Sequence, residues 1–224
     1  MFNKNAISRI IPFAIYMLFL AADNRFVQLF NHFSIDVKWL YFIKITAVII
    51  ALAYFWRSYD ELRIKPPTQD FVYAGVAGLI VFVIWIFPYP SWLASGNEVA
   101  GINPMLDQMT LQNIWWMTTR ILGATLAVSV MEELFWRSFI MRWFDNKDFL
   151  TIDPGKITAF AYIGSACLFA LEHHLWLAGL FAGLVYGELY KTYKNLWIPI
   201  FAHAVTNGML GIWVVLTGNW QYWQ

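Results

Sequence analysis

The sequence has little charge and almost no cysteine, and both shortages narrow what the protein can be. Only 13% of the 224 residues are charged, while 60% are hydrophobic. Soluble domains carry about 25% charged residues, so this composition excludes an ordinary soluble domain and indicates a polytopic membrane protein. The single cysteine, Cys167, excludes an internal disulfide and a cysteine-rich metal cluster. We expect Cys167 to lie in the core of the protein.

Basic segments are also missing. The net charge is +1, and no arm rich in lysine or arginine occurs anywhere in the chain. The sequence therefore gives no indication of a nucleic-acid partner. The partner that its composition does indicate is the lipid bilayer, and its many tryptophans and tyrosines suit the two membrane interfaces.

Long hydrophobic segments dominate the chain. Seven of them are expected as membrane spans, at residues 1–22, 39–56, 71–87, 113–144, 157–173, 175–190 and 196–216. The first ends in small residues, as a cleaved signal peptide does, but we expect it to be the first span. Residues 88–111 are rich in proline, glycine and asparagine and are expected to form a loop.

The fold class that follows is an all-α membrane protein, a polytopic helical bundle of about seven transmembrane helices. Residues 1–112 hold spans one to three with their loops, and residues 113–224 hold spans four to seven. Together they are expected to form a single integral membrane domain.

Positive charge alternates along the expected loops. The loops after spans two, four and six are basic, with Arg57, Arg63, Lys65, Arg142, Lys147, Lys156, Lys191 and Lys194. No lysine or arginine lies between Lys65 and Arg120 or after Lys194, although the expected loop that holds Arg25 and Lys38 dilutes the pattern. The positive-inside rule then predicts a multi-pass protein of the cell (inner) membrane, with its N-terminus cytoplasmic and its C-terminus outside.

The fourth span contains three charged residues close together, Glu132, Glu133 and Arg137. Each charge costs about 2.5–3.5 kcal/mol at the centre of a bilayer, so such a group suggests a function. Glu133 and Arg137 are four residues apart and can pair on one helix face, whereas Glu132 is turned about 100° away. Taken alone, this pattern fits a structural ion pair as well as a catalytic site.

Two further polar clusters lie in expected spans. One is the segment 169–174, FALEHH, at the end of span five, and the other is His203 with Asn207 in span seven. His203 and Asn207 are four residues apart, so both can address one small volume. A lone histidine or asparagine in a span more often joins helices by hydrogen bonds. We expect Glu172 and His174 at the membrane interface, in contact with water.

Other polar or small residues in the spans have a structural interpretation. Gly179, Gly183 and Gly187 form a stripe at four-residue spacing that lets a neighbouring helix approach closely. Lys44 is expected to reach the interface or to form a salt bridge.

Three motifs occur in a fixed order. EELFWR at 132–137 matches EExxxR, FALEH at 169–173 matches FxxxH, and HAVTN at 203–207 matches HxxxN. These are the motifs of the CAAX-processing and bacteriocin-processing (CPBP/Abi-type) intramembrane protease family, which the chain resembles over about residues 121–211. The length and the tryptophan-rich core also resemble the bacterial branch that accompanies exosortase systems.

The resemblance implies an intramembrane endopeptidase that cleaves a membrane-associated protein or peptide. Glu132 would be the general base that activates water, assisted by His173. His203 and Asn207 would bind the carbonyl oxygen as negative charge develops on it. In straight helices His173 would lie on the order of 10 Å from Glu132 along the membrane normal, so a tilt or a shifted helix end is needed.

Glu133 and Arg137 would support the site by pairing and holding the helix. No cofactor is required as a first choice, but glutamates and histidines are also zinc ligands, so a divalent metal ion stays open. HExxH and GxSxG are absent, and every aspartate lies outside or at the edge of an expected span. The metal-dependent, serine and aspartyl types of site are therefore not indicated.

Two alternatives to an enzyme stay open from the residues. One is a non-catalytic membrane adaptor or immunity protein, and the other is a proton-coupled transporter that uses Glu132 and the histidines as a relay. The absence of an evident inverted repeat disfavours transport. The sequence does not fix the substrate, the cleavage position or the oligomeric state.

Overall fold

A computed structural model describes residues 3–90, 103–104 and 110–223. Within these ranges the chain is helical and forms no β-strand. Three helices, Lys4–Ala21, Leu111–Trp143 and Trp197–Thr217, are long and apolar enough to cross a membrane, and Asp70–Trp85 and Ala159–Leu171 are shorter apolar helices. The prediction of an all-α membrane protein is confirmed, while the number of seven spans stays a prediction. Most of the loop predicted at 88–111 lies outside the described residues.

Except for α2, which was not predicted, the main helices begin and end close to the predicted positions. Their bounds are α1 Lys4–Ala21, α2 Asp23–His32, α3 Lys38–Tyr54, α4 Asp70–Trp85, the long helix Leu111–Trp143, α8 Ala159–Leu171, α9 Trp176–Tyr193 and α10 Trp197–Thr217.

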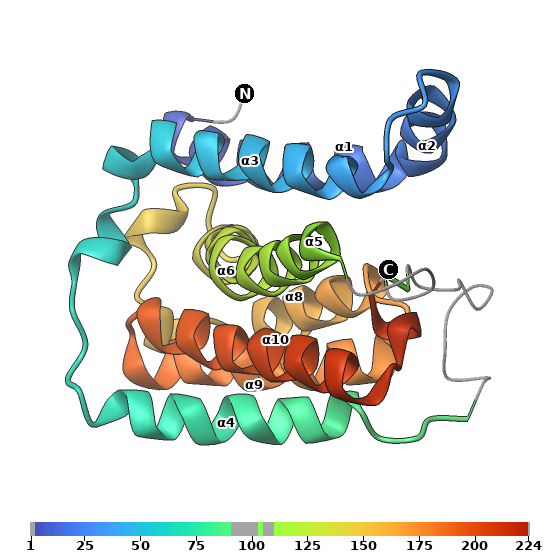
Figure 1. Ribbon diagram of the computed structural model, residues 1–224. Helices are drawn as coiled ribbons and strands as arrows, with labels where there is room; N and C mark the ends of the chain where they lie inside the picture. The colour runs from blue at the N-terminus through green and yellow to red at the C-terminus, as the bar shows by residue number, and fades with distance from the viewer. Residues whose placement is uncertain (1–2, 91–102, 105–109, 224) are drawn as a thin grey trace.

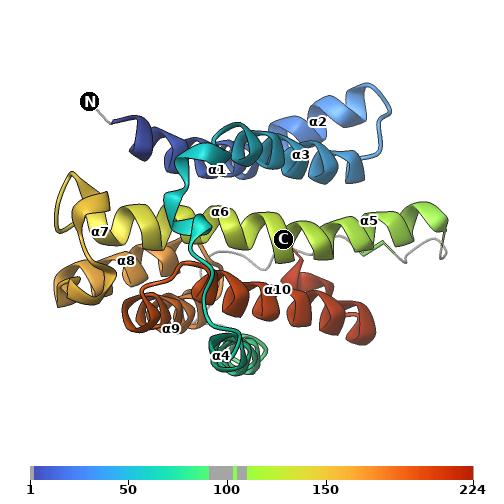
Figure 2. The same ribbon diagram turned by 90° about the vertical axis from the view of Figure 1, so that its left-hand side faces the viewer.

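The long helix lies in the middle of the bundle. Helices α1 and α3 pack side by side on one face of it, and α8, α9 and α10 lie on the other (Figures 1 and 2). Helix α4 packs on the outside, against α9 and α10. Because protein flanks the long helix on both sides, its charged residues can face other helices rather than lipid.

Large apolar side chains cover the outer faces of the helices. Phe160 on α8 is 74% exposed, Leu216 on α10 is 79% exposed and Ile50 on α3 is 63% exposed. Such exposure is unfavourable in water but suits contact with acyl chains. It agrees with the predicted membrane environment.

The glycine stripe of α9 packs against α8, as its spacing predicts. A Cβ atom at Gly183 would lie 3.0 Å from the Cα of Ala166, and one at Gly187 would lie 2.9 Å from the ring of Tyr162. The absence of side chains at these positions therefore brings the two helices together.

Three local predictions were wrong. The expected loop that holds Arg25 and Lys38 contains helix α2, Asp23–His32. Cys167 is exposed on the outer face of α8, because the buried face of that helix is set by Ala166, Phe169 and their neighbours. Lys44 is buried with its ammonium 4.6 Å from the ring centroid of Tyr16, so a cation–π contact replaces the position at the interface.

Candidate active site

The long helix changes its winding on both sides of the two glutamates. Segment α6, Ser129–Glu133, is flanked by π-helical segments at Gly123–Val128 and Leu134–Ile140. The wider winding makes a backbone carbonyl available to accept hydrogen bonds from side chains. Ala124 O accepts such a bond from Ser129 Oγ at 3.2 Å. Such π segments are frequent at functional sites. The sequence predicted one continuous helix here but gave no sign of the π segments.

Glu133 has two partners inside the bundle. Its Oε1 lies 3.1 Å from Arg137 Nη1 and 2.9 Å from His203 Nδ1. Glu133 is fully buried and Arg137 is 2% exposed. The pairing with Arg137 is the one that the four-residue spacing predicts. The bond to His203 connects the long helix to α10 and compensates buried charge.

Glu132 is buried on another face of the same helix and lacks such partners. Among the described residues the Oε2 atoms of Glu132 and Glu133 both lack a hydrogen-bond partner. Glu133 has its other oxygen paired with Arg137 and His203, whereas Glu132 Oε2 is 3.9 Å from His203 Nε2. Glu132 is 7% exposed. A buried carboxylate without a partner is costly to maintain, which marks this group as a candidate for function.

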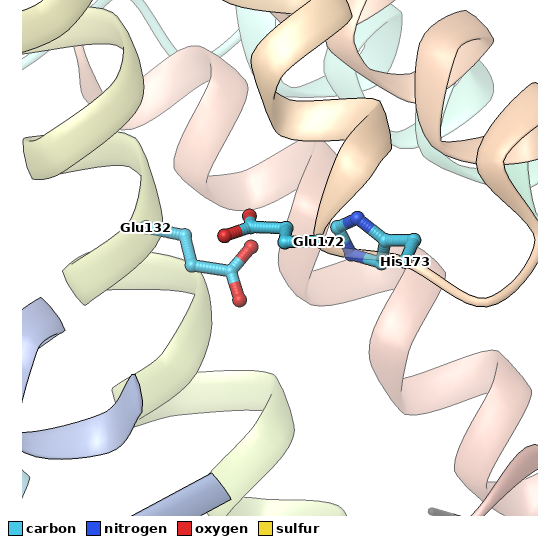
Figure 3. Close-up of side chains that lie close together, drawn as sticks. All are labelled: Glu132, Glu172 and His173. Carbon is cyan, nitrogen blue, oxygen red and sulfur yellow. The ribbon is translucent and has the colours of Figure 1, made fainter. Parts of the chain in front are cut away.

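The segment that follows α8 brings His173 to Glu132. Ligand atoms of Glu132, Glu172 and His173 all lie within 4.8 Å of one another (Figure 3). The separation expected from straight helices does not occur, because α8 ends at Leu171 and Glu172 and His173 lie beyond the end of the helix. His173 Nδ1 lies 2.7 Å from Phe169 O. Since a carbonyl only accepts, Nδ1 of the neutral ring carries the hydrogen and Nε2 keeps its lone pair.

Glu172 is a site residue that the sequence interpretation missed. We expected it in water at the interface, but it is half-buried and accepts a hydrogen bond from Trp136 Nε1 at 2.8 Å. Figure 3 shows its carboxylate turned toward that of Glu132. Its position next to His173 was the only signal available, because FxxxH leaves the residue before the histidine unspecified.

Asn207 extends from α10 toward the first π segment. Its Nδ2 donates to Ala124 O at 3.1 Å and makes a longer contact of 3.4 Å to Ser129 Oγ. One amide hydrogen is therefore engaged by the backbone of the long helix. The side chain is positioned by a carbonyl that the π winding makes available.

All four predicted catalytic residues line one cavity. Glu132, His173, His203 and Asn207 border a space of about 210 Å³, together with aromatic residues such as Tyr16 and Trp85. The long helix, the segment after α8 and α10 each contribute to it. A carboxylate, two imidazoles and a carboxamide in one cavity provide the groups for hydrolysis by water.

The residues that could hold a metal ion lie at the same cavity, which Glu132 and His173 line, with Glu172 beside them. Within the described part of the chain, Glu132, Glu172 and His173 offer two carboxylates and an imidazole. Glu133 takes no part in it, because Arg137 and His203 engage its carboxylate.

Comparison with known proteins places this site within a recognised domain. Residues 114–209 match the model of one family, described as type II CAAX prenyl endopeptidase Rce1-like. The match contains all three motifs and confirms the resemblance to the CAAX protease family. A search of the curated proteins and a search of the solved structures each found no match. The branch that accompanies exosortases stays a prediction.

Proposed function

We propose that this chain, which carries an Rce1-like domain over residues 114–209, is an intramembrane endopeptidase in which Glu132 activates water. Its substrate is a peptide bond of a membrane-associated protein or peptide that enters the cavity. The observation that carries the proposal is the buried Oε2 of Glu132, without a hydrogen-bond partner among the described residues and close to the imidazole of His173.

Glu132 and His173 share the activation of water in this proposal. A water molecule between them can donate one hydrogen to Glu132 and the other to the Nε2 lone pair of His173. Glu132 accepts the proton as the water oxygen attacks the peptide carbonyl. It returns this proton to the leaving amine as the C–N bond of the tetrahedral intermediate breaks. The hydrogen bond from His173 Nδ1 to Phe169 O supports this role, because it fixes the ring and its tautomer.

His203 and Asn207 stabilise the oxyanion. His203 Nδ1 bonds to Glu133. The other ring nitrogen of His203, Nε2, lies on the side of the catalytic carboxylate, 3.9 Å from Glu132 Oε2. Nε2 donates to the oxyanion when the ring carries both protons. Asn207 supplies its second amide hydrogen, which makes only the long contact to Ser129. Preorganised donors of this kind typically contribute about 2.7–4 kcal/mol each.

Glu133 and Arg137 hold the site in place. Glu133 orients the ring of His203. Arg137 pairs with Glu133 and packs over the ring of Phe169 at 4.4 Å. Phe169 in turn supplies the carbonyl that binds His173. The ion pair thus positions both histidines without contacting the substrate.

The proposed reaction uses no metal ion, because Glu132 itself accepts the proton from water. The prenyl group named in the family description is not part of the proposal, since the assigned residues act on the peptide bond alone.

The test is cleavage in H₂¹⁸O with the full chain in liposomes. Peptides derived from membrane proteins are added as a mixture, and new termini are detected by mass spectrometry. The wild type should create new carboxyl termini, and Glu132→Gln should create none while accumulating as a folded protein. Glu188→Gln, at an exposed glutamate of α9, is the matched control and should behave as wild type.

The same preparation separates the enzyme from the two alternatives. An adaptor would leave every peptide uncut in the wild type as well. A transporter would move protons across the liposome membrane, and Glu132→Gln would abolish that flux. Either result would contradict the peptidase proposal.

A further inference from the structure

A positively charged side chain lines the catalytic cavity but has no role in the proposed reaction. Arg120 borders the same cavity as Glu132, and both residues belong to the long helix. Twelve residues at about 1.5 Å each separate them by roughly 18 Å along the helix axis. The cavity therefore extends from the catalytic carboxylate to a guanidinium group.

Aromatic rings hold Arg120 at this position. Its Cζ atom lies 5.0 Å from the ring centroid of Tyr41, 5.6 Å from that of Trp116 and 5.5 Å from that of Trp223. The hydroxyl of Tyr41 also donates to the backbone carbonyl of Arg120 at 3.1 Å. Because a guanidinium has five N–H donors, Arg120 can bind an anion in addition to its contacts with the protein.

Two neighbouring side chains favour an anion at the same place. Lys44 Nζ lies 5.3 Å from the ring centroid of Tyr41, so Lys44 and Arg120 share one ring. Lys44 is only 8% exposed, and its charge therefore acts strongly on its surroundings. Tyr16 lines the cavity, and its hydroxyl is close enough to Glu132 and Arg120 to interact with both charges.

We propose that Arg120 and Tyr16 bind a carboxylate of the peptide substrate, and that the enzyme thereby selects peptides with an acidic group at a set distance from the scissile bond. The planar fork of a guanidinium matches a carboxylate in two parallel hydrogen bonds. Lys44 adds positive charge from behind the tyrosine rings. This inference deepens the proposed function and rests on it.

The length of the cavity sets the position of that carboxylate. An extended peptide advances about 3.3–3.6 Å per residue, so roughly 18 Å corresponds to about five residues. An aspartate or glutamate side chain and a C-terminal carboxylate offer the same chemistry at this distance. The scissile bond should therefore lie about five residues from one of these two groups.

Binding is tested with three fluorescent ten-residue peptides of alanine and leucine on the full chain in detergent. The first contains one glutamate and the second one glutamine, both with an amidated C-terminus, and the third contains the glutamine and a free C-terminal carboxylate. Fluorescence anisotropy with the Glu132→Gln protein measures binding without cleavage. The first or the third peptide should bind at least about tenfold more tightly than the second, and the tighter one identifies the source of the carboxylate. Equal affinities, or no binding of any peptide, would overturn the site.

Variants of Arg120 then assign the preference to this residue. Arg120→Gln in the Glu132→Gln protein should remove the preference for the carboxylate, and Arg120→Lys should keep part of it. Arg57→Gln, at an exposed arginine in the turn Trp56–Ser58, is the matched control and should leave the preference unchanged. A preference that persists in folded Arg120→Gln would exclude Arg120 as the binding group. The comparison of peptides on one protein holds even if this variant does not fold.

Cleavage separates this inference from the proposed function. For a peptide that the wild type cuts, replacement of the carboxylate by an amide should raise KM at least about tenfold with little change in kcat. If peptides were cut but the acid and the amide gave the same KM, the carboxylate site would fail and the proposed function would stand. If the carboxylate peptides bound more tightly but none was cut, the proposed function would fail and the site would stand.

Discussion

Glu132 and Glu133 are adjacent in the chain but have opposite surroundings. Glu133 Oε1 lies 3.1 Å from Arg137 Nη1 and 2.9 Å from His203 Nδ1, whereas the contact between Glu132 Oε2 and His203 Nε2 is 3.9 Å long. Among the described residues the Oε2 atoms of both glutamates lack a hydrogen-bond partner. The 100° turn per residue of a helix produces this division. Glu133 positions its neighbours in the site, and Glu132 is the carboxylate proposed to activate water.

Removal of Arg137 should destabilise the protein strongly. In Arg137→Met, Glu133 keeps a buried charge without its cation, so the free energy of unfolding should fall by about 3–5 kcal/mol. Denaturant unfolding in a mild detergent measures it. The double variant Glu133→Gln, Arg137→Met should recover part of the loss. A single variant as stable as the wild type would show that the pair does not compensate buried charge.

Asn207→Ala should remain folded and lose most of its activity. Loss of one oxyanion donor typically lowers kcat about 10²–10³-fold. The rate of cleavage of a peptide found with the wild type is the measurement. Asn219→Ala, at a half-buried asparagine beyond α10, is the control and should keep its rate. An undiminished rate in Asn207→Ala would remove this residue from the mechanism.

Glu61 should make stability depend on acid pH. It lies in the turn Asp60–Arg63 between α3 and α4, outside the spans. Burial alone would raise the pKa of Glu61, but the charge of Arg9 and hydrogen bonds from Arg9 and Ser138 lower it below the usual 4.5. Its folded pKa is therefore the lower one, so its stabilisation is complete above pH 4.5 and is lost as the pH falls through that pKa.

The unfolding temperature measured from pH 7 to pH 3 tests this dependence. Below about pH 4.5 it should fall more steeply in the wild type than in Glu61→Gln. Parallel curves for the two proteins would contradict the assignment.

The sequence predicted the parts of this fold that depend on local pattern. Hydrophobic runs predicted the ends of the main helices to within a few residues. The four-residue spacing of Glu133 and Arg137 predicted their ion pair. The glycine spacing of α9 predicted its close packing on α8. Each of these follows from helix geometry and needs no knowledge of the neighbouring helices.

The remaining features depend on tertiary contacts that one sequence does not display. The π segments around Ser129–Glu133 depend on partners such as Asn207, which lies far along the chain. The placement of Glu172 depends on where α8 ends and on the indole of Trp136. Cys167 was assigned to the core although it lies on the outer face, because an apolar helix in lipid is hydrophobic on all sides.

Cleavage in H₂¹⁸O by the wild type and by Glu132→Gln tests the central claim most directly. If Glu132 activates water, the wild type places one ¹⁸O atom in each new carboxyl terminus, and the folded Glu132→Gln protein yields no such product. Labelled termini from Glu132→Gln at the rate of the wild type would contradict the account.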